Sequence, residues 1–593
     1  MHHPFSLRLS CLAPIAVMAI LCHAPAQASP QALHKLFKHD WQWQMQNKPQ
    51  FATEVGENRY NHALNDVSPA ALLAEHKHTR QVLQQAKKIG TRGLTGQDLL
   101  SYQVFLSEKE NLLKAAQFYP YQVYALSPQA GIHLELVQLV EKMPFQTTRD
   151  YQNYIARLNA VPKHVDGLIA QLDASIKLGW LAPKVVIEKL PKQIRHLSEQ
   201  LGHSSLAQPA KQIPATFTNA NQFQSQIQAN LESKVKPALA KLADYVQNTY
   251  LPACRDSIAA KDLPGGRAYY DFLVRQTTTT DLTAEQIHAT GLQEVARIQA
   301  EMQVVMKQTG FTGDFKQFVH KLNTEPQFFY SKPEDLLQGY RDIMARAHAQ
   351  LPKQFGRLPI GQVDVKPVPV LGAEEQGGAY YEPGTPDGSR RGYFVANTSK
   401  LETRPKWKME TLTLHEAEPG HHFQIAIAQE VQGLPEFRRF GWYVAFGEGW
   451  ALYAESLGQD LGFYTDPYSM FGHLDDELYR AARLVVDTGI HAFGWSRQQA
   501  IDYMNNNTAN PPDDNVVEID RYISWPSQAL GYKIGQLKIQ QLREQSKAAL
   551  GDQFDLRQFH DVLLGNGGLP LHLAEKQIMA WQQSKLRASN KQK

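Results

Sequence analysis

The chain contains a run of eight residues, His415-Glu-Ala-Glu-Pro-Gly-His-His422, with the residue types of a zinc hydrolase site. In the common His-Glu-x-x-His arrangement, two helical histidines four residues apart hold Zn²⁺, and the glutamate activates a water molecule. Here Pro419 stands at the position of the second histidine. On a straight helix, His421 points about 120° away from His415, and His422 lies about 10 Å along the axis. A regular helix therefore cannot bring either residue to the ion that His415 would bind.

Pro419 and Gly420 indicate how the helix is interrupted. Proline has no N–H to donate to the carbonyl of His415 and its ring crowds the preceding turn, whereas glycine tolerates the resulting backbone angles. An interruption that absorbs two residues brings His421 to the ligand position, and one that absorbs three brings His422 there. The smaller distortion favours His421. The competing interpretation is a helix that stops at residue 418, followed by a turn and two surface histidines.

A third metal ligand is predicted from a second segment, Phe446-Gly-Glu-Gly-Trp-Ala-Leu-Tyr-Ala-Glu455. This segment resembles the Asn-Glu-Gly-Phe-Ala segment of aminopeptidase-N-type zinc enzymes, and the resemblance implies that Glu448 binds the metal. Glu455 lies two turns further along the same helix face, where it is either a carboxylate that orients a ligand histidine or a solvated residue. Three protein ligands leave one coordination position open, as in catalytic zinc sites.

These segments belong to a wider resemblance. The chain resembles the bacterial "domain of unknown function 885" family, which is grouped with gluzincin-like metallopeptidases, over roughly residues 50–585. The further blocks that carry it are Leu263-Pro-Gly-Gly-Arg-Ala-Tyr-Tyr270, Ala379-Tyr-Tyr381, Asp387-Gly-Ser-Arg390, Glu477-Leu-Tyr-Arg480, Arg483-Leu-Val-Val-Asp-Thr-Gly-Ile-His491 and Trp525-Pro-Ser-Gln-Ala-Leu-Gly-Tyr-Lys-Ile-Gly535. The resemblance implies a mainly α fold around a zinc cleft, and a peptidase-type hydrolase.

The expected mechanism assigns a role to each residue near the metal. Zn²⁺ on the two histidines and Glu448 would lower the pKa of its water, and Glu416 would act as general base and then as acid toward the leaving amine. Tyr532 is the first candidate for the oxyanion donor and His491 the second. The competing interpretation for both is that they only satisfy hydrogen bonds in the core.

A substrate-binding role is considered for four residues. Arg390, Arg480 and Lys533 are candidates to clamp a substrate carboxylate, with arginine the better bidentate partner. Tyr381 is a candidate for the cleft wall. Ordinary ion pairs, or packing in the case of Tyr381, are the competing interpretation for each.

Length, charge and composition limit the classes of protein to which this chain can belong. The chain has 593 residues, a net charge of +3 and 43% hydrophobic residues, which fits a globular protein of several lobes without a strong polyanion partner such as nucleic acid. Residues 1–28 read as a cleaved signal peptide, with Arg8, an apolar run of about ten residues and a small-x-small site before Ser29. That run is too short to span a bilayer. Lipidation at Cys22 is disfavoured because Leu21 precedes it. The expected location is therefore the periplasm or outside the cell.

Only Cys254 remains after the predicted leader, which excludes a zinc site made of several thiolates.

The predicted organisation places a helical lobe at residues 29–262 and a zinc-site lobe at 263–593. Helical periodicity predicts helices at residues 68–88, 98–117, 148–178 and 222–250, and a capping box at Thr283 and Gln286 opens another to about residue 309. A small antiparallel sheet is expected near residues 360–400, with strands at 363–370 and 391–397. The metal-site lobe is expected to contain a bulged helix at 403–432, helices at 440–461, 475–493 and 528–548, and a loop at 514–522.

The sequence thus predicts a secreted zinc-dependent metallopeptidase that hydrolyses short peptides. One alternative is a zinc amide hydrolase acting on peptidoglycan-type peptides, and another is a non-catalytic protein that binds peptides or metal. Retention of Glu416 beside a metal ligand argues against the non-catalytic alternative, because a purely structural site needs no base there.

Overall fold

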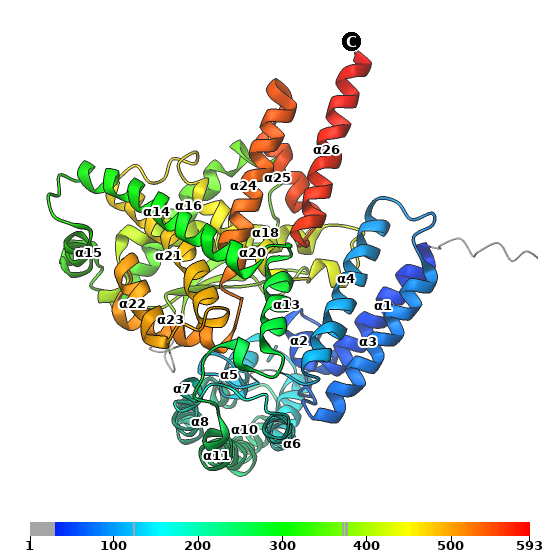
Figure 1. The fold of residues 1–593 in the computed structure, drawn as a ribbon. Coiled ribbons are helices and arrows are strands. Elements are labelled where there is room, and N and C mark those ends of the chain that lie inside the picture. The colour runs from blue at the N-terminus through cyan, green and yellow to red at the C-terminus, as the bar shows by residue number, and fades with distance from the viewer. Residues whose placement is uncertain (1–29, 123–124, 370–372, 374–376, 593) are drawn as a thin grey trace, which may run out of the picture.

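The computed structural model describes residues 30–122, 125–369, 373 and 377–592, and these are mainly helical (Figure 1). The predicted signal peptide, including Cys22, lies outside the described residues. No helix among the described residues has the length and apolar character needed to cross a bilayer.

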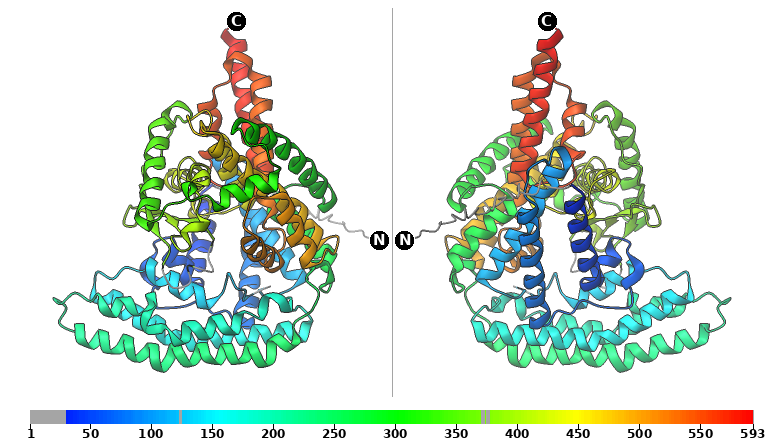
Figure 2. Two further views of the ribbon diagram at one scale, coloured as in Figure 1. Left: turned by 90° about the vertical axis from the view of Figure 1, so that its left-hand side faces the viewer. Right: turned by 90° about the vertical axis from the view of Figure 1, so that its right-hand side faces the viewer.

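The first helices form one side of the molecule, beside a base layer (Figure 1). The side is made of α1 (Pro30–Asn47), α2 (Pro49–Glu54), α3 (Pro69–Ile89) and α4 (Gly96–Phe118). The base layer comprises α5 (Ile132–Lys142), α6 (Thr148–Leu178), α7 (Lys184–Ile187), α8 (Leu190–Glu199), α9 (Gln208–Lys211), α10 (Ala220–Asn230), α11 (Lys236–Tyr245) and α12 (Leu251–Ala253). Its long helices run across the bottom of the molecule in both views of Figure 2.

The remaining helices follow the base layer in the chain, and several of them line the candidate site. They are α13 (Gly266–Thr278), α14 (Ala284–Gln308), α15 (Phe315–Thr324), α16 (Pro333–Gln350), α17 (Met409–Glu416), α18 (His421–Glu430), α19 (Glu436–Arg439), α20 (Val444–Ser456), α21 (Pro467–His491), α22 (Arg497–Asn507), α23 (Pro512–Ser524), α24 (Leu530–Leu550), α25 (Leu556–Leu564) and α26 (Leu571–Gln592). The helices α24 and α26 project from the top of the molecule in Figure 1.

Local signals explain the helix ends that the sequence predicted. The prediction at 148–178 coincides with α6, which starts at a capping box of Thr147 and Asp150 and stops at Gly179, whose φ of 71° is left-handed. The capping box at Thr283 and Gln286 opens α14 as expected. The predicted loop at 514–522 is wrong, because α23 covers it. Pro512 occupies the first turn of that helix, and acidic residues follow it where the helix dipole favours them.

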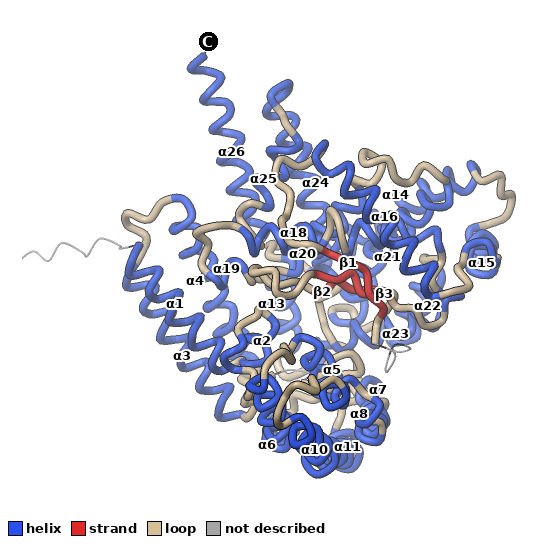
Figure 3. Tube along the Cα trace, turned by 180° about the vertical axis from the view of Figure 1, so that it is seen from behind, coloured by secondary structure: helices blue, strands red, loops and turns tan. Residues whose placement is uncertain are grey.

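A small sheet lies in the middle of the molecule (Figure 3). It contains β1 (Val363–Pro367), β2 (Ala379–Glu382) and β3 (Gly392–Ala396) in the order β1-β3-β2. β1 pairs parallel with β3, and β2 pairs antiparallel with it. The predicted antiparallel sheet is therefore mixed, because the chain crosses over after β1 and forms β2 before it reaches the central strand.

Two large apolar cores cross the predicted lobe boundary at residue 263. One core joins the base layer to α14 and α21, and the other joins α1, α3 and α4 to the sheet and to α17, α18, α20 and α24. The helices that carry the candidate ligands, α17, α18 and α20, pack in the second core, and α21 of the first core lies against α17 and α20.

Candidate metal centre

The metal-site segment is interrupted where Pro419 predicted it. Instead of one bulged helix, α17 ends at Glu416 and α18 begins at His421. A side chain at position 420 would collide with the carbonyl oxygens of Leu414 and His415, so this close turn requires glycine. The indole N–H of Trp450 donates a hydrogen bond of 2.8 Å to the carbonyl of Pro419 and holds the link. Both histidines after the break are buried, unlike in the surface-histidine interpretation.

This break brings His415, His421 and Glu448 together. Candidate ligand atoms of the three lie within 4.8 Å of one another, and no other group of three or more His, Cys, Asp or Glu side chains in the described ranges comes this close. Oε2 of Glu448 lies 3.3 Å from Nε2 of His421 and 3.7 Å from Nε2 of His415. This oxygen is buried and has no hydrogen bond within the described part of the chain.

The spacing of these atoms fits a zinc ion. Ligands bound at about 2.0–2.2 Å in a tetrahedron are about 3.3–3.6 Å from one another. The two nitrogen–oxygen separations are close to this range, and an oxygen without a hydrogen bond is free to bind a metal. Two imidazoles and one carboxylate are also the ligand types of known catalytic zinc sites.

The charges of the triad are arranged for a cation. Burial opposes protonation of His415, but its contacts with Glu448 and Glu455 outweigh this and raise its pKa to about 9. Burial likewise opposes ionisation of Glu448, yet the neighbouring histidines hold its pKa well below the usual range. The carboxylates therefore attract positive charge to the centre of the triad.

His422 lies beside the triad and is held away from it. Its Nδ1 lies 2.9 Å from the hydroxyl of Tyr381, and its Nε2 lies 3.1 Å from the carbonyl of Gly361. Burial lowers the pKa of His422 to about 4, so the ring is neutral near pH 7. The structure thus turns His421, which the smaller distortion favoured, toward Glu448.

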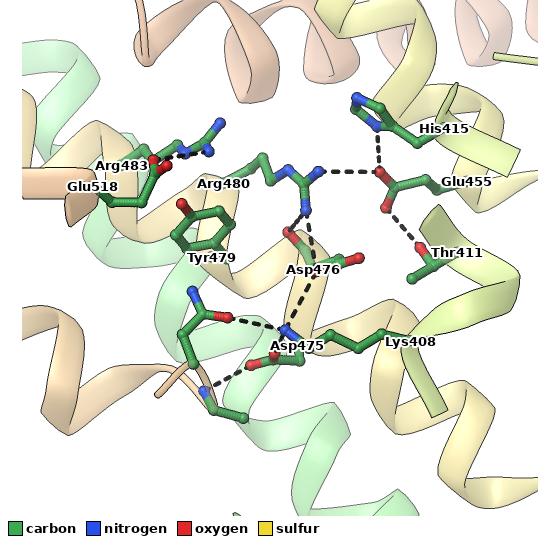
Figure 4. Close-up of polar contacts among 12 residues, drawn as sticks. Lys408, Thr411, His415, Glu455, Asp475, Asp476, Tyr479, Arg480, Arg483 and Glu518 are labelled. Atoms are coloured by element: carbon green, nitrogen blue, oxygen red, sulfur yellow. Dashed lines mark hydrogen bonds and ion pairs between the residues drawn. The ribbon is translucent and has the colours of Figure 1, made fainter. Parts of the chain in front are cut away.

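Glu455 is buried behind His415 rather than solvated. Its Oε1 lies 2.6 Å from Nδ1 of His415, and the hydroxyl of Thr411 donates to its Oε2 at 2.9 Å (Figure 4). Arg480 approaches the same carboxylate at 3.8 Å and pairs with Asp476 at 3.2 Å. With Nδ1 committed to a carboxylate, His415 presents Nε2 to the triad, as metal-binding histidines commonly do.

The triad opens into a cavity of about 1090 Å³. Glu416, which follows the first candidate ligand, lines this cavity. Tyr532 also lines it, with its ring nearly parallel to that of His415 at a centroid separation of 6.5 Å. Tyr381 contributes from the edge strand β2. A candidate base, a hydroxyl donor and a strand edge therefore surround the triad.

Comparison with known proteins identifies the family. Residues 49–578 match the model of the bacterial proteins of unknown function named DUF885. The chain belongs to the DUF885 family. The computed structure is similar to that of a candidate lipoprotein from Colwellia psychrerythraea, with a TM-score of 0.89 and 30% identity over 94% of this chain and 100% of that one. A search of the curated proteins found no match.

A second solved structure shares the fold at lower identity. It is a candidate lipoprotein of unknown function from Shewanella oneidensis, with a TM-score of 0.71 and 18% identity. The match covers 93% of this DUF885 chain and 100% of the other.

Three of the predicted residues lie outside the cavity of this DUF885 protein. His491 is fully buried, accepts from the backbone N–H of Ala260 at 3.0 Å, and contacts the carbonyl of Tyr522 at 2.9 Å. Both ring nitrogens are thus occupied, so His491 is not positioned as an oxyanion donor.

Two predicted clamp residues are committed to contacts within the protein, Lys533 in ion pairs and Arg390 in hydrogen bonds to backbone carbonyls. Lys533 is fully buried and pairs with Glu477 at 2.6 Å and Glu294 at 2.9 Å. Arg390 donates to the carbonyls of Glu54 and Lys142 and so ties the strand region to the first helices. Arg480 does line the cavity, but its terminal nitrogens contact carboxylates of the protein itself.

Sequence reasoning missed cavity residues of the DUF885 protein that the structure reveals. Arg483 lines the cavity one helical turn after Arg480, and Arg521 lines it from α23. The i, i+3 spacing of the first pair was a signal for a shared face. Trp442 places its ring 5.7 Å from that of His421, but it precedes α20 in an irregular stretch, where periodicity gives no guidance.

Proposed function

We propose that this DUF885 protein is a zinc-dependent metallopeptidase, related to the gluzincins, that hydrolyses short peptides. The observation that carries the proposal is the buried triad of His415, His421 and Glu448 with Glu416 beside it in one cavity. A structural zinc site needs four protein ligands and no base, whereas this triad has three and opens to a space where a substrate fits.

Zinc at this triad would supply Lewis acidity and lower the pKa of a water molecule. Glu416, which lines the cavity, would take the proton of the attacking water and return it to the leaving amine. Tyr532, which also lines the cavity, would donate a hydrogen bond to the oxyanion. Glu455 orients His415, and Arg480 and Thr411 in turn hold Glu455.

The edge strand β2 supports a peptide as the substrate. β2 is at one edge of the sheet, and Ala379, Tyr380 and Tyr381 of this strand line the cavity. An exposed strand edge can bind an extended peptide through main-chain hydrogen bonds. The cavity volume of about 1090 Å³ slightly exceeds the range of about 300–1,000 Å³ typical of small-molecule sites, which suits a peptide of a few residues.

An exported location is part of the proposal. The relatives from Colwellia and Shewanella are described as candidate lipoproteins, and lipoproteins are exported. The apolar run and cleavage pattern of residues 1–28 agree with export.

The test combines metal analysis with turnover of a mixed peptide library. Zinc-loaded protein is expected to bind one zinc per chain and to cleave peptides. Glu416→Gln is expected to keep zinc and lose roughly 10²–10⁴-fold in rate, because a general base contributes about that much. Glu418→Gln is the matched control, since Glu418 pairs with His348 at 2.8 Å and does not line the cavity.

Two results would contradict the proposal. Zinc binding without cleavage of any peptide would favour the non-catalytic binding protein. Cleavage that is equally fast after Glu416→Gln would remove the assigned base. A second library built on peptidoglycan stem peptides tests the amide-hydrolase alternative. That alternative predicts that only the second library is cleaved.

A further inference from the structure

Two arginines in the cavity share a single carboxylate. Glu518 lies 3.3 Å from Nη2 of Arg483 and 3.3 Å from Nη1 of Arg521, and all three residues line the cavity. Burial opposes ionisation of Glu518, but the guanidinium groups of Arg521 and Arg483 outweigh it and lower its pKa to about 2. One negative charge therefore faces two positive charges, and this part of the wall keeps a surplus of one positive charge.

Arg483 is held rigidly and has a free terminal nitrogen. Its Nε donates to the hydroxyl of Tyr522 at 2.8 Å, and its guanidinium lies over the rings of Tyr479 and Tyr532 at 4.3 and 4.5 Å. The side chain is 5% exposed. Within the described part of the chain, its Nη1 is buried and makes no hydrogen bond. Buried donors are almost always paired, so this nitrogen indicates that an acceptor from a ligand belongs there.

Tyr532 links the position of Arg483 to that of the metal triad, because its ring lies near both the Arg483 guanidinium and the ring of His415. The ring of Tyr532 contacts the guanidinium at 4.5 Å and lies 6.5 Å from the ring of His415. Arg480 and Arg483 extend from α21 on the side where His415 lies (Figure 4). An anion bound by Arg483 would thus occupy the same cavity as the metal triad and the reacting peptide bond.

The clamp residues that the sequence predicted are already committed within the protein. Arg480 pairs with Asp476 and approaches Glu455, and Lys533 is fully buried between Glu477 and Glu294. Arg483 differs because a whole terminal nitrogen is unused. Its planar fork also matches the two oxygens of a carboxylate.

We infer that Arg483, assisted by Arg521, binds the C-terminal carboxylate of the peptide substrate. The enzyme therefore removes one or a few residues from the C-terminal end of peptides. This inference rests on the proposed peptidase function and narrows its substrate class to peptides with a free α-carboxylate.

The test uses two synthetic pentapeptide libraries that differ only in having a free C-terminal acid or a C-terminal amide. Zinc-loaded wild-type protein is expected to cleave the acid library roughly 10–100-fold more efficiently, since hydrogen bonds to a charged group contribute about 1.5–3 kcal/mol. Arg483→Gln should reduce kcat/KM for the acid library by a similar factor and leave the amide library within about threefold. The readout is the ratio of kcat/KM for the acid library to kcat/KM for the amide library. Displacement of Tyr532 would lower both values together and leave this ratio unchanged.

Matched variants separate recognition from folding. Arg497→Gln removes the same charge from an ion pair with Asp520 outside the cavity, and it should leave the acid-to-amide ratio unchanged. Arg483→Lys keeps the charge but loses the fork, so it should recover part of the preference.

A binding measurement decides the inference even if no peptide is cleaved. Equilibrium dialysis of both libraries against the zinc-loaded Glu416→Gln protein should deplete the acid library at least about tenfold more strongly, and adding Arg483→Gln should abolish the difference. Equal depletion of the two libraries would overturn the inference. Binding of amide peptides through the carboxylates of their own Asp or Glu side chains would also overturn it. If no peptide is cleaved but dialysis shows a clear preference for the acid library, the proposed peptidase function is contradicted and the binding role of Arg483 is supported.

Discussion

The base layer and the helices around the metal triad bury very different side chains. In α11 of the base layer the buried residues are Ala238, Leu239, Leu242 and Ala243. In α21 every residue from Phe471 to His491 is buried, and these include three acidic residues in a row at 475–477 and two arginines. Burying an ionised group costs several kcal/mol unless a partner compensates. Next to the cavity such groups form a paired network, whereas the buried Arg157 of α6 in the base layer donates to backbone carbonyls and to the hydroxyl of Thr53.

This difference indicates which part of the fold is constrained by function. The buried positions of α11 need only apolar volume, and any well-packed set of apolar side chains would serve there. The charged core of α21 is stable only as a network, in which Lys408 contacts Asp475 at 2.6 Å and Arg480 contacts Asp476 at 3.2 Å (Figure 4). We interpret this network as the rigid support of Glu455 and, through it, of His415.

The largest effect on the site is expected from loss of a metal ligand. His421→Ala should abolish stoichiometric zinc binding, an effect larger than the 10–100-fold typical of losing an outer partner. His422→Ala is the matched control. It removes an adjacent buried imidazole that contacts Tyr381 and Gly361, and it should keep zinc. Metal content after dialysis measures both, and loss of zinc only in the His422 variant would reverse the ligand assignment.

The next largest effect is expected at the proposed oxyanion donor. Tyr532→Phe should lower kcat roughly 10²–10³-fold and leave zinc bound, because one hydrogen bond to the oxyanion is worth about that much. Steady-state kinetics with a cleaved library peptide provide the measurement. An unchanged kcat would remove Tyr532 from the mechanism.

A smaller effect on zinc is expected at Glu455. Glu455→Gln weakens the contact with Nδ1 of His415 and should reduce zinc affinity about 10–100-fold. Competition with a chelator of known affinity measures the change. If zinc affinity does not change, the charged network has no role in supporting the metal.

The smallest effect on the site is expected from the base layer. Leu239→Ala removes a fully buried side chain of α11 and should cost about 2–5 kcal/mol of unfolding free energy. Zinc affinity measured in the folded protein should not change. A parallel loss of zinc affinity would show that the two regions are coupled, contrary to the comparison.

The base layer was the easier region to predict from sequence. Residues 148–178 showed an amphipathic period, and α6 has those limits. Capping and periodicity are local properties, so they are readable from one sequence. The predicted interruption near Pro419 and the preference for His421 also followed from local geometry, because Pro419 excludes a regular helix, although the structure has two separate helices in place of the one bulged helix expected at 403–432.

The parts that failed depend on contacts between distant segments. Parallel pairing of β1 with β3 leaves no mark in either strand, so the mixed sheet was not foreseen. The roles of Lys533 and Arg390 depend on carboxylates and carbonyls far away in the chain, as does the backbone pairing of His491. Arg483 was missed for the same reason. Its unpaired Nη1 is recognised only when the positions of Glu518 and of the neighbouring tyrosine rings are known.

The central claim is that one zinc ion binds between His415, His421 and Glu448. Anomalous diffraction at the zinc absorption edge from crystals of metal-replete protein tests it most directly. We predict one strong peak about 2.0–2.2 Å from Nε2 of both histidines and from a carboxylate oxygen of Glu448. A peak at His422, or no peak among the three side chains, would contradict the account.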